Sequence, residues 1–375
     1  MIYFDSGATT LQKPPAVARA TALAMGRMAS PGRGGHRPGL LAAQATFRCR
    51  ELAAELFHVP TPEQVVLTFN ATHGLNIAIE TLVKPGMSVL ISGYEHNAVT
   101  RKLASVPEVA VKVASARPFD RDGMLADFRR KMTPEVDVVI CNHVSNVFGF
   151  ILPVDEIGKL CAERGKSLII DASQSAGTLP VHLDELNADF IAMPGHKGLY
   201  GPQGTGLLLC GERVDGAPVL FGGTGSLSAL QTMPEFLPDR LEAGTHNVCG
   251  IAGLTEGIRF VCRKGQSCIL RHEQELTKCM VQGLKAIPGV EVFSGDPETQ
   301  SGLCSFRAEQ MDCETLGEAL ARRGIAVRAG LHCAPLAHRS AGTEESGTVR
   351  ISFSAFNSRW EVERALQILR EILSC

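Results

Sequence analysis

The sequence predicts an α/β fold, in which a mostly parallel sheet is flanked by helices and a smaller α+β region follows. Between about residues 60 and 210, short apolar runs alternate with helical patterns, which is typical of strands joined by crossover helices. The runs are apolar almost throughout, as expected when helices cover both faces of a sheet. Near residue 250 the pattern changes to helices that are each followed by a strand.

The first region supplies six expected strands and two clear helices. The strands are residues 64–69, 88–92, 136–142, 167–173, 189–193 and 205–210. In the helix expected over residues 72–83, Leu75, Ile79 and Val83 fall on one face. A second helix over residues 154–165 ends at a glycine, the residue favoured just beyond a helix C-terminus.

The last third contains three helices and two short strands. The helices are expected at residues 274–287, 312–324 and 358–374, the last clearly amphipathic, and the strands at residues 290–295 and 324–330. We therefore expect a large domain of residues 14–250 and a small α+β domain formed by residues 1–13 and 251–375.

Composition excludes several classes of protein. The net charge of −2 argues against binding nucleic acid through phosphate neutralisation, and no apolar run approaches the roughly 18–20 residues of a membrane span. The first residues include Asp5 and no basic segment, so no signal peptide is expected and the predicted location is cytoplasmic. Residues 160–167 fail as a P-loop, because Leu160 replaces the first glycine and a strand follows.

The twelve cysteines are expected to be reduced. No signal peptide is expected before them and no Cys-x-x-Cys occurs, so most should be small buried hydrophobic residues. Cys141 and His143 form one closely spaced pair with no second pair to complete a zinc site. We therefore expect no metal centre.

Lys197 is the first candidate functional residue. It follows the strand expected at 189–193, at the carboxyl end where open α/β sheets bind ligands, and Gly195 and Gly198 flank it. One interpretation is a loop lysine beside a tight turn. The other is a lysine that forms a Schiff base with a flat cofactor, since burial makes an amine reactive and glycines let a planar group approach the backbone.

Polar residues at neighbouring strand ends favour the second interpretation. Asp171 could cap a helix, or it could pair with a pyridinium nitrogen so that the ring acts as an electron sink. Gln174 could reach a ring hydroxyl and His96 could stack on the ring. Thr72 begins a helix whose N–H groups suit a phosphate. Together these residues predict a site for pyridoxal 5'-phosphate.

Ordered motifs extend this prediction over nearly the whole chain. They are "YFDSGATTLQKP", "GRGGHRPG", "FNATHGLN", "YEHNAV", "HVSNVFG", "IIDASQSAG", "PGHKGLYGPQGTG", "RLEAGTHN", "RAGLHCAP" and "GTVRISFSAFNS". In this order they resemble the class V aminotransferase family of fold-type I pyridoxal phosphate enzymes. Within that family they resemble the branch of cysteine desulfurases and selenocysteine lyases.

The resemblance implies a role for each matching residue. Lys197 is the Schiff-base lysine, Asp171 pairs with the pyridine nitrogen, and His96 stacks on the ring. Further cofactor contacts are implied at Ala71, Thr72, Gln174 and His196 and, across the interface of a homodimer, at Thr245. Substrate contacts are implied at His36, Asn146, Arg328 and Arg350. Arg350 suits a carboxylate through its bidentate fork, although a turn-forming Asn146 and a strand-edge Arg350 remain alternatives.

Cys333 in "VRAGLHCAP" separates the possible functions. It could be a packed thiol, but Arg328 and His332 place groups able to carry positive charge nearby, a setting typical of reactive cysteines. In the desulfurase branch the matching cysteine attacks the sulfur of L-cysteine, which leaves a persulfide on the enzyme and releases alanine. L-selenocysteine would release selenium by the same route, and an acceptor protein could take the sulfur.

Two other functions remain open. A class V aminotransferase, or another lyase acting on a small amino acid, would use the same lysine and aspartate without Cys333. A non-catalytic scaffold would have no need of an electron sink.

The sequence departs from the family at two places. Pro194 stands where relatives usually carry a serine or threonine that contacts the phosphate, and proline offers neither a hydroxyl nor a backbone N–H. Residues 336–347 differ from the best-known desulfurases and are expected to reshape the substrate entrance.

Overall fold

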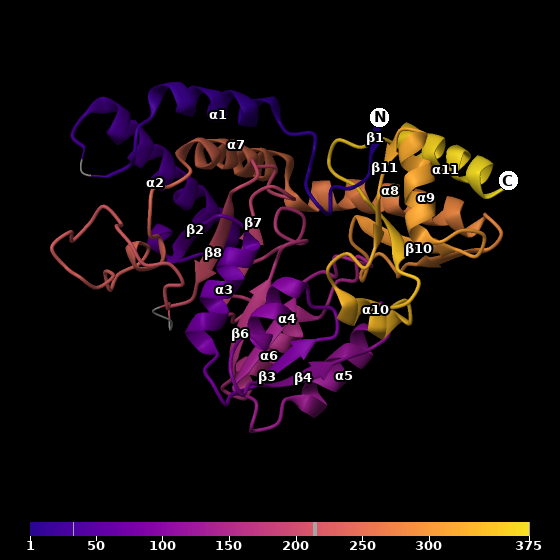
Figure 1. The fold of residues 1–375 in the computed structure, drawn as a ribbon, viewed down its shortest axis with the longest axis horizontal. Coiled ribbons are helices and arrows are strands. Elements are labelled where there is room, and N and C mark those ends of the chain that lie inside the picture. Colours follow the sequence, from indigo (N-terminus) through magenta and orange to yellow (C-terminus); the bar gives the residue numbers. More distant parts are fainter. Residues whose placement is uncertain (33, 213–215, 375) are drawn as a thin grey trace.

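A seven-stranded sheet forms the centre of the fold (Figure 1). The structure is a computed structural model that describes residues 1–32, 34–212 and 216–374. The strand order is β2-β8-β7-β6-β5-β3-β4. In chain order these strands are β2 (Val65–Thr68), β3 (Ser88–Ser92), β4 (Ala110–Ala114), β5 (Val138–Asn142), β6 (Ser167–Asp171), β7 (Phe190–Pro194) and β8 (Gly206–Cys210).

Most of this sheet is parallel, which confirms the predicted fold class. The strands from β7 through β6, β5 and β3 to β4 run in one direction, whereas β8 is antiparallel to both of its neighbours. Every residue of β5, β7 and β8 is buried. The continuous apolar runs in the sequence therefore reflect a sheet covered on both faces.

Helices cover the two faces of the sheet. The helices of this part of the chain are α1 (Pro15–Arg27), α2 (Arg37–Phe57), α3 (Ala71–Leu82), α4 (Asn97–Ala104), α5 (Arg121–Lys131), α6 (Val154–Glu163) and α7 (Val248–Lys264), with short 3₁₀ turns at Pro62–Gln64 and Asp239–Leu241. Ile169 belongs to the apolar cluster that includes residues of α3 and α4, whereas its neighbour Ile170 belongs to the cluster that includes residues of α2, α5, α6 and α7. Alternate residues of one strand thus feed two separate apolar layers.

The second body is built around a small antiparallel sheet with the order β12-β13-β10-β9. Its elements are α8 (Gln266–Lys285), β9 (Val290–Phe293), β10 (Leu303–Ala308), α9 (Cys313–Arg322), β11 (Ile325–Ala326), β12 (Arg328–Gly330), α10 (Pro335–Ala341), β13 (Thr348–Ser352) and α11 (Arg359–Leu373). The N-terminal strand β1 (Ile2–Tyr3) pairs with β11. Both chain termini therefore lie at this body (Figure 1).

Several details differ from the sequence-based expectation, which also did not include β10, β13 and the helices α1, α2, α4, α5, α7 and α10. The expected boundary at residue 250 falls inside α7, whose Leu254 and Ile258 pack in the core of the first body, so the transition follows Lys264. The single strand expected at residues 324–330 is divided into β11 and β12, which join different sheets. The edge strand β4 was not predicted, because its first residues are exposed and carry no continuous apolar run.

Among the described residues, no helix is both long and apolar enough to cross a membrane.

Candidate active site

A cavity of about 580 Å³ opens at the carboxyl ends of the parallel strands. Asn142 and Asp171 end β5 and β6, and their backbones pair in register. Lys197 follows β7, and the second body contributes the loop that contains Cys333. The fold therefore brings most of the predicted residues from distant segments to one place. Those that line the cavity are Ala71, Thr72, His96, Asn146, Asp171, Gln174, His196, Lys197, Arg328, Cys333 and Arg350.

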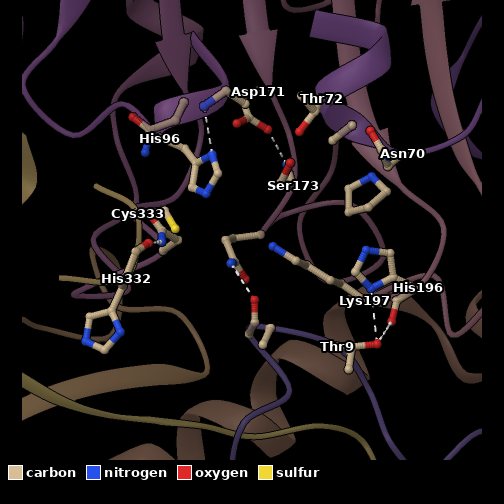
Figure 2. Close-up of a pocket in the computed structure, with 18 of the residues that line it drawn as sticks. Thr9, Asn70, Thr72, His96, Asp171, Ser173, His196, Lys197, His332 and Cys333 are labelled. Atoms are coloured by element: carbon tan, nitrogen blue, oxygen red, sulfur yellow. Dashed lines mark hydrogen bonds between the residues drawn. The ribbon is translucent and has the colours of Figure 1, made fainter. Parts of the chain in front are cut away.

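Lys197 extends into the middle of this cavity, and the Cys333 thiol faces the same space from the opposite wall (Figure 2). Burial and, next, the positive charge of Arg350 lower the pKa of the lysine amine to about 8, while Asp171 opposes this shift. The amine therefore loses its proton at a lower pH than an ordinary lysine, which favours a nucleophilic role.

The glycines beside Lys197 have a structural role that the sequence did not reveal. A side chain at Gly195 would collide with Thr205, and one at Gly198 would collide with the carbonyl oxygen of Ala176. The backbone of this segment is thus in close contact with neighbouring parts of the chain. The glycines are required by close packing of the chain, which fixes where the lysine begins.

Asp171 is buried, and one oxygen of its carboxylate accepts a hydrogen bond from the Ser173 N–H at 2.9 Å. No helix follows it, so the interpretation as a helix cap is wrong. The Gln174 amide donates to the carbonyl oxygen of Gly7 at 2.9 Å, which ties this wall to the N-terminal segment.

His96 caps the N-terminus of α4, where its Nδ1 accepts from the Ala98 N–H at 3.0 Å. An accepting Nδ1 leaves the ring proton on Nε2. Burial lowers the pKa of His96, and the neighbouring Asp171 opposes that shift. The ring is therefore a neutral, flat surface with a fixed orientation.

Opposite His96, the N-terminus of α3 begins with Ala71 and Thr72, and Asn70 caps it by accepting from the His73 N–H at 2.9 Å. The His196 Nδ1 lies 3.1 Å from the Thr9 hydroxyl, and burial lowers the pKa of His196 to about 4. Pro194 lines the cavity nearby. Helix N–H groups and a threonine hydroxyl thus stand where an anion could bind.

Asp5 connects the two candidate arginines, a role that the sequence did not reveal. Its carboxylate lies 2.8 Å from the Arg350 Nη2 and 3.3 Å from the Arg328 Nε. Arg350 is buried and also donates to the carbonyl oxygen of Asn146 at 2.9 Å, while its Nε has no hydrogen-bond partner among the described residues. Asp5 lies in the quoted motif "YFDSGATT", which was its only signal in the sequence.

The Cys333 loop joins β12 to α10 and is held by its backbone. His332 and Cys333 both have positive φ angles, 50° and 58°. The Asn146 amide donates to the His332 carbonyl oxygen at 2.7 Å, and the Asn97 N–H donates to the Cys333 carbonyl oxygen at 2.8 Å. Among the described cysteines, all of which are free, Cys333 alone lines this cavity, with its side chain exposed.

The electrostatic setting of the thiol differs from the expected one. Burial and the nearby Arg350 push the pKa of His332 well below its usual value, so the imidazole is neutral. Arg328 is already paired with Asp5. His332 therefore supplies a hydrogen bond to Thr348 and no positive charge.

Residues 336–347, expected to reshape the entrance, form most of α10 and the turn after it. Ala337 belongs to the core of the first body, and the Ser340 hydroxyl donates to the Gly93 carbonyl oxygen at 3.1 Å. This segment therefore braces the Cys333 loop against the loop that precedes His96.

Two predicted residues lie outside the cavity. His36 is exposed and caps α2, and Thr245 is exposed beside His246. Thr245 lines a second cavity of about 510 Å³ together with residues 30–32. Within one chain, neither residue is near Lys197.

Residues 2–365 match the family description "Aminotransferase class-V". The chain belongs to the class V aminotransferase family. A probable cysteine desulfurase of Methanothermobacter thermautotrophicus is 32% identical over 380 residues, covering 99% of this chain and 94% of that protein. Another, from Mycolicibacterium paratuberculosis, is 31% identical over 99% of this chain, which spans only 55% of that protein.

The fold comparison agrees with this membership. The apo structure of a cysteine desulfurase from Thermococcus onnurineus superposes with a TM-score of 0.90 at 31% identity, covering all of this chain and 94% of that one.

Proposed function

We propose that this chain is a pyridoxal-phosphate-dependent cysteine desulfurase, which converts L-cysteine to alanine and keeps the sulfur as a persulfide on Cys333. One observation carries the proposal: the Cys333 thiol and the Lys197 amine line the same cavity. An aminotransferase needs the lysine but has no task for a thiol there. The family members named probable cysteine desulfurases support the same activity.

The residues of the cavity fit pyridoxal 5'-phosphate. The buried Asp171 can accept a hydrogen bond from a ring N–H, and His96 offers a flat face. The N-terminus of α3 and Thr72 suit the phosphate despite Pro194, and the Lys197 amine suits the aldehyde. When bound, this cofactor supplies an electron sink for negative charge at the α-carbon of the substrate.

In this proposal Lys197 moves the proton at the substrate α-carbon. An amine with a pKa of about 8 can both accept and return a proton near neutral pH, which is the condition for efficient acid–base catalysis. Close packing of the glycine-flanked segment limits where its side chain can reach.

Cys333, as a thiolate that has lost its proton, then accepts the sulfur. A bond forms between its Sγ and the substrate sulfur while the bond from that sulfur to the β-carbon breaks, and the electron pair of the broken bond stays on the carbon. A proton completes the methyl group of alanine. L-selenocysteine can react by the same displacement at selenium. The exposed position of Cys333 leaves the persulfide accessible to an acceptor protein.

The carboxylate of the substrate is proposed to bind at Arg350, with Asn146 and Arg328 beside it. The Nε of Arg350 is buried and unpaired among the described residues, so the guanidinium retains a donor for a new partner. Asp5 orients the same guanidinium. A bound carboxylate must therefore share Arg350 with Asp5.

We also propose a homodimer. His36 and Thr245 are exposed and lie away from the cavity of their own chain. The segment just before His36 lines the same second cavity as Thr245, so both belong to one surface. From that surface they can contact substrate and phosphate in the cavity of a second copy.

Product analysis tests the function directly. The purified protein is incubated with L-cysteine or L-selenocysteine and a reductant, and alanine and sulfide or selenide are quantified. Equal amounts of alanine and sulfide are expected, and borohydride should attach the cofactor covalently to Lys197, as seen by peptide mass spectrometry. Pyruvate or a new amino acid in place of alanine would favour the other lyase or aminotransferase.

A further inference from the structure

A cluster of metal-ligating side chains lies at the opposite edge of the central sheet from the active-site cavity. His58 follows α2, and His182 and Glu185 lie in the turn that precedes β7. One nitrogen of each imidazole and one carboxylate oxygen of Glu185 lie within 4.8 Å of one another. None of these residues contributes to the proposed desulfurase chemistry.

The distances suit a single ion. The Glu185 carboxylate is 3.0 Å from the His182 Nδ1 and 3.9 Å from the His58 Nδ1. Ligands bound to zinc at about 2.0–2.2 Å in a tetrahedron are roughly 3.2–3.6 Å apart, so rotation of the two imidazoles out of their stacked arrangement would bring these atoms onto one ion. Asp184, with an oxygen 4.0 Å from the His58 Nδ1, provides a fourth candidate ligand.

The backbone holds the two histidines together. The Leu183 N–H donates to the Phe57 carbonyl oxygen at 3.0 Å, and both of these side chains are buried in the core. The two imidazole rings are stacked with their centres 3.7 Å apart. The cluster is therefore anchored on both sides by packed residues.

One nitrogen in the cluster is buried without a hydrogen bond in the part of the chain that the structure describes. The His182 Nδ1 is buried and makes no hydrogen bond of acceptable geometry with any described residue, although the Glu185 carboxylate is close. A buried nitrogen without a hydrogen bond is costly unless something else binds it. Imidazole nitrogens favour zinc, copper and nickel, whereas magnesium and calcium favour oxygen ligands.

We propose that His58, His182 and Glu185 bind a divalent transition-metal ion of the zinc class, with Asp184 as the fourth ligand. The ion connects the C-terminal end of α2 to the turn before β7. An ion that binds only the folded chain stabilises it by mass action.

Zinc titration tests the site in the intact protein, after alkylation with N-ethylmaleimide so that thiols cannot bind the metal. His182→Gln and Glu185→Gln should each lower the affinity for one bound zinc ion by more than about tenfold. Loss of a residue that only supports a metal ligand already costs about tenfold, and loss of a ligand should cost more. His58→Asn should do the same. Asparagine is chosen because residue 58 has a φ of 50°, a conformation that asparagine tolerates. Glu163→Gln, an exposed substitution on α6, is the matched control.

Two further measurements make the result specific. An anomalous difference map at the zinc edge should place the ion beside the two Nδ1 atoms and the Glu185 carboxylate, and zinc should raise the melting temperature of the wild-type protein but not of His182→Gln. Equal zinc affinity in wild type and all three site variants would overturn the proposal. An anomalous peak found only at another place in the protein would also overturn it. Circular dichroism checks that the variants are folded.

Discussion

At the scale of single residues, the Cys333 loop is the most constrained part of the site. Two consecutive residues other than glycine, His332 and Cys333, adopt positive φ angles, a conformation that costs free energy and persists only when surrounding contacts enforce it. Hydrogen bonds from Asn146 and Asn97 enforce it here. The thiol is thus exposed on a loop that holds one position.

Cys333→Ser is expected to abolish alanine formation from L-cysteine and persulfide formation, because a hydroxyl cannot replace the thiolate as the group that attacks sulfur. Lys197 and Asp171 are unchanged, so the cofactor should still bind and the protein should stay yellow. Alanine assays and mass spectrometry of the intact protein check both results. Cys262→Ser, at another exposed thiol, is the control. An undiminished rate in the serine variant would show that Cys333 takes no part.

The lowered pKa of Lys197 predicts a pH dependence for the cofactor-free protein. The amine must lose its proton before it attacks an aldehyde, so borohydride-trapped cofactor on Lys197 should increase through about pH 8 and then level off. An ordinary lysine, with a pKa of about 10.4, would still be gaining reactivity. The unfolded chain keeps this proton up to higher pH, so stability should also rise with pH above 8. A midpoint near 10 would contradict the assignment.

At the scale of elements, the segment from β7 to β8 fixes the lysine by backbone contact. Gly198 lies directly against the Ala176 carbonyl oxygen, so there is no room for a side chain. The rigidity of this element therefore depends on a contact between two loops at the carboxyl edge of the sheet.

Gly198→Ala should displace the Lys197 segment, with a loss of stability of about 1–3 kcal/mol, typical of overpacking, or more, and a large fall in cofactor incorporation. Urea denaturation and absorbance of the bound cofactor measure the two effects. Gly26→Ala on α1, where nothing lies within 4 Å of the added carbon, should be neutral or slightly stabilising. If both variants behave alike, close packing does not position the lysine.

At the scale of the whole molecule, a buried ion pair between Glu242 and Arg50 holds the segment around Thr245 against α2. Glu242 and Arg50 are both buried, with an oxygen to nitrogen distance of 2.5 Å, and Glu242 also accepts from the Leu67 N–H at 2.6 Å. In Figure 1 the chain from residue 216 to α7 extends from the molecule beside α2. Exposed residues of this segment, such as Thr245, form the surface on which the proposed second copy would bind.

The proposed homodimer predicts complementation between two defective chains. Lys197→Ala removes the lysine, and Thr245→Ala weakens phosphate binding in the partner's cavity. In a mixed dimer, one cavity combines an intact lysine with the partner's intact threonine, so part of the activity lost by each parent should return. Activity and cofactor affinity after subunit exchange measure this. A fully active monomer in light scattering, or no recovery on mixing, would contradict the dimer.

Much of the fold and site follows from local sequence. The strands are continuous apolar runs, and polar residues such as Asp171 stand where these runs stop. Because the carboxyl ends of parallel strands lie at one edge of the sheet, these polar residues were expected to lie close together there. Ordered motifs extended this to the family. By contrast, β4 was missed because an edge strand with exposed residues has no apolar run.

Only the tertiary structure decided how the side chains interact. Asp5 meets Arg350 and Arg328, and His58 meets His182, although neither set is close in sequence. The close packing of Gly198 and the neutrality of His332 likewise depend on surrounding atoms. The sequence by itself determined the fold class, six strands of the central sheet and the family, because periodicity and motifs are properties of short segments. Contacts, burial and charge state depend on the distance between segments, and that is set only when the chain folds.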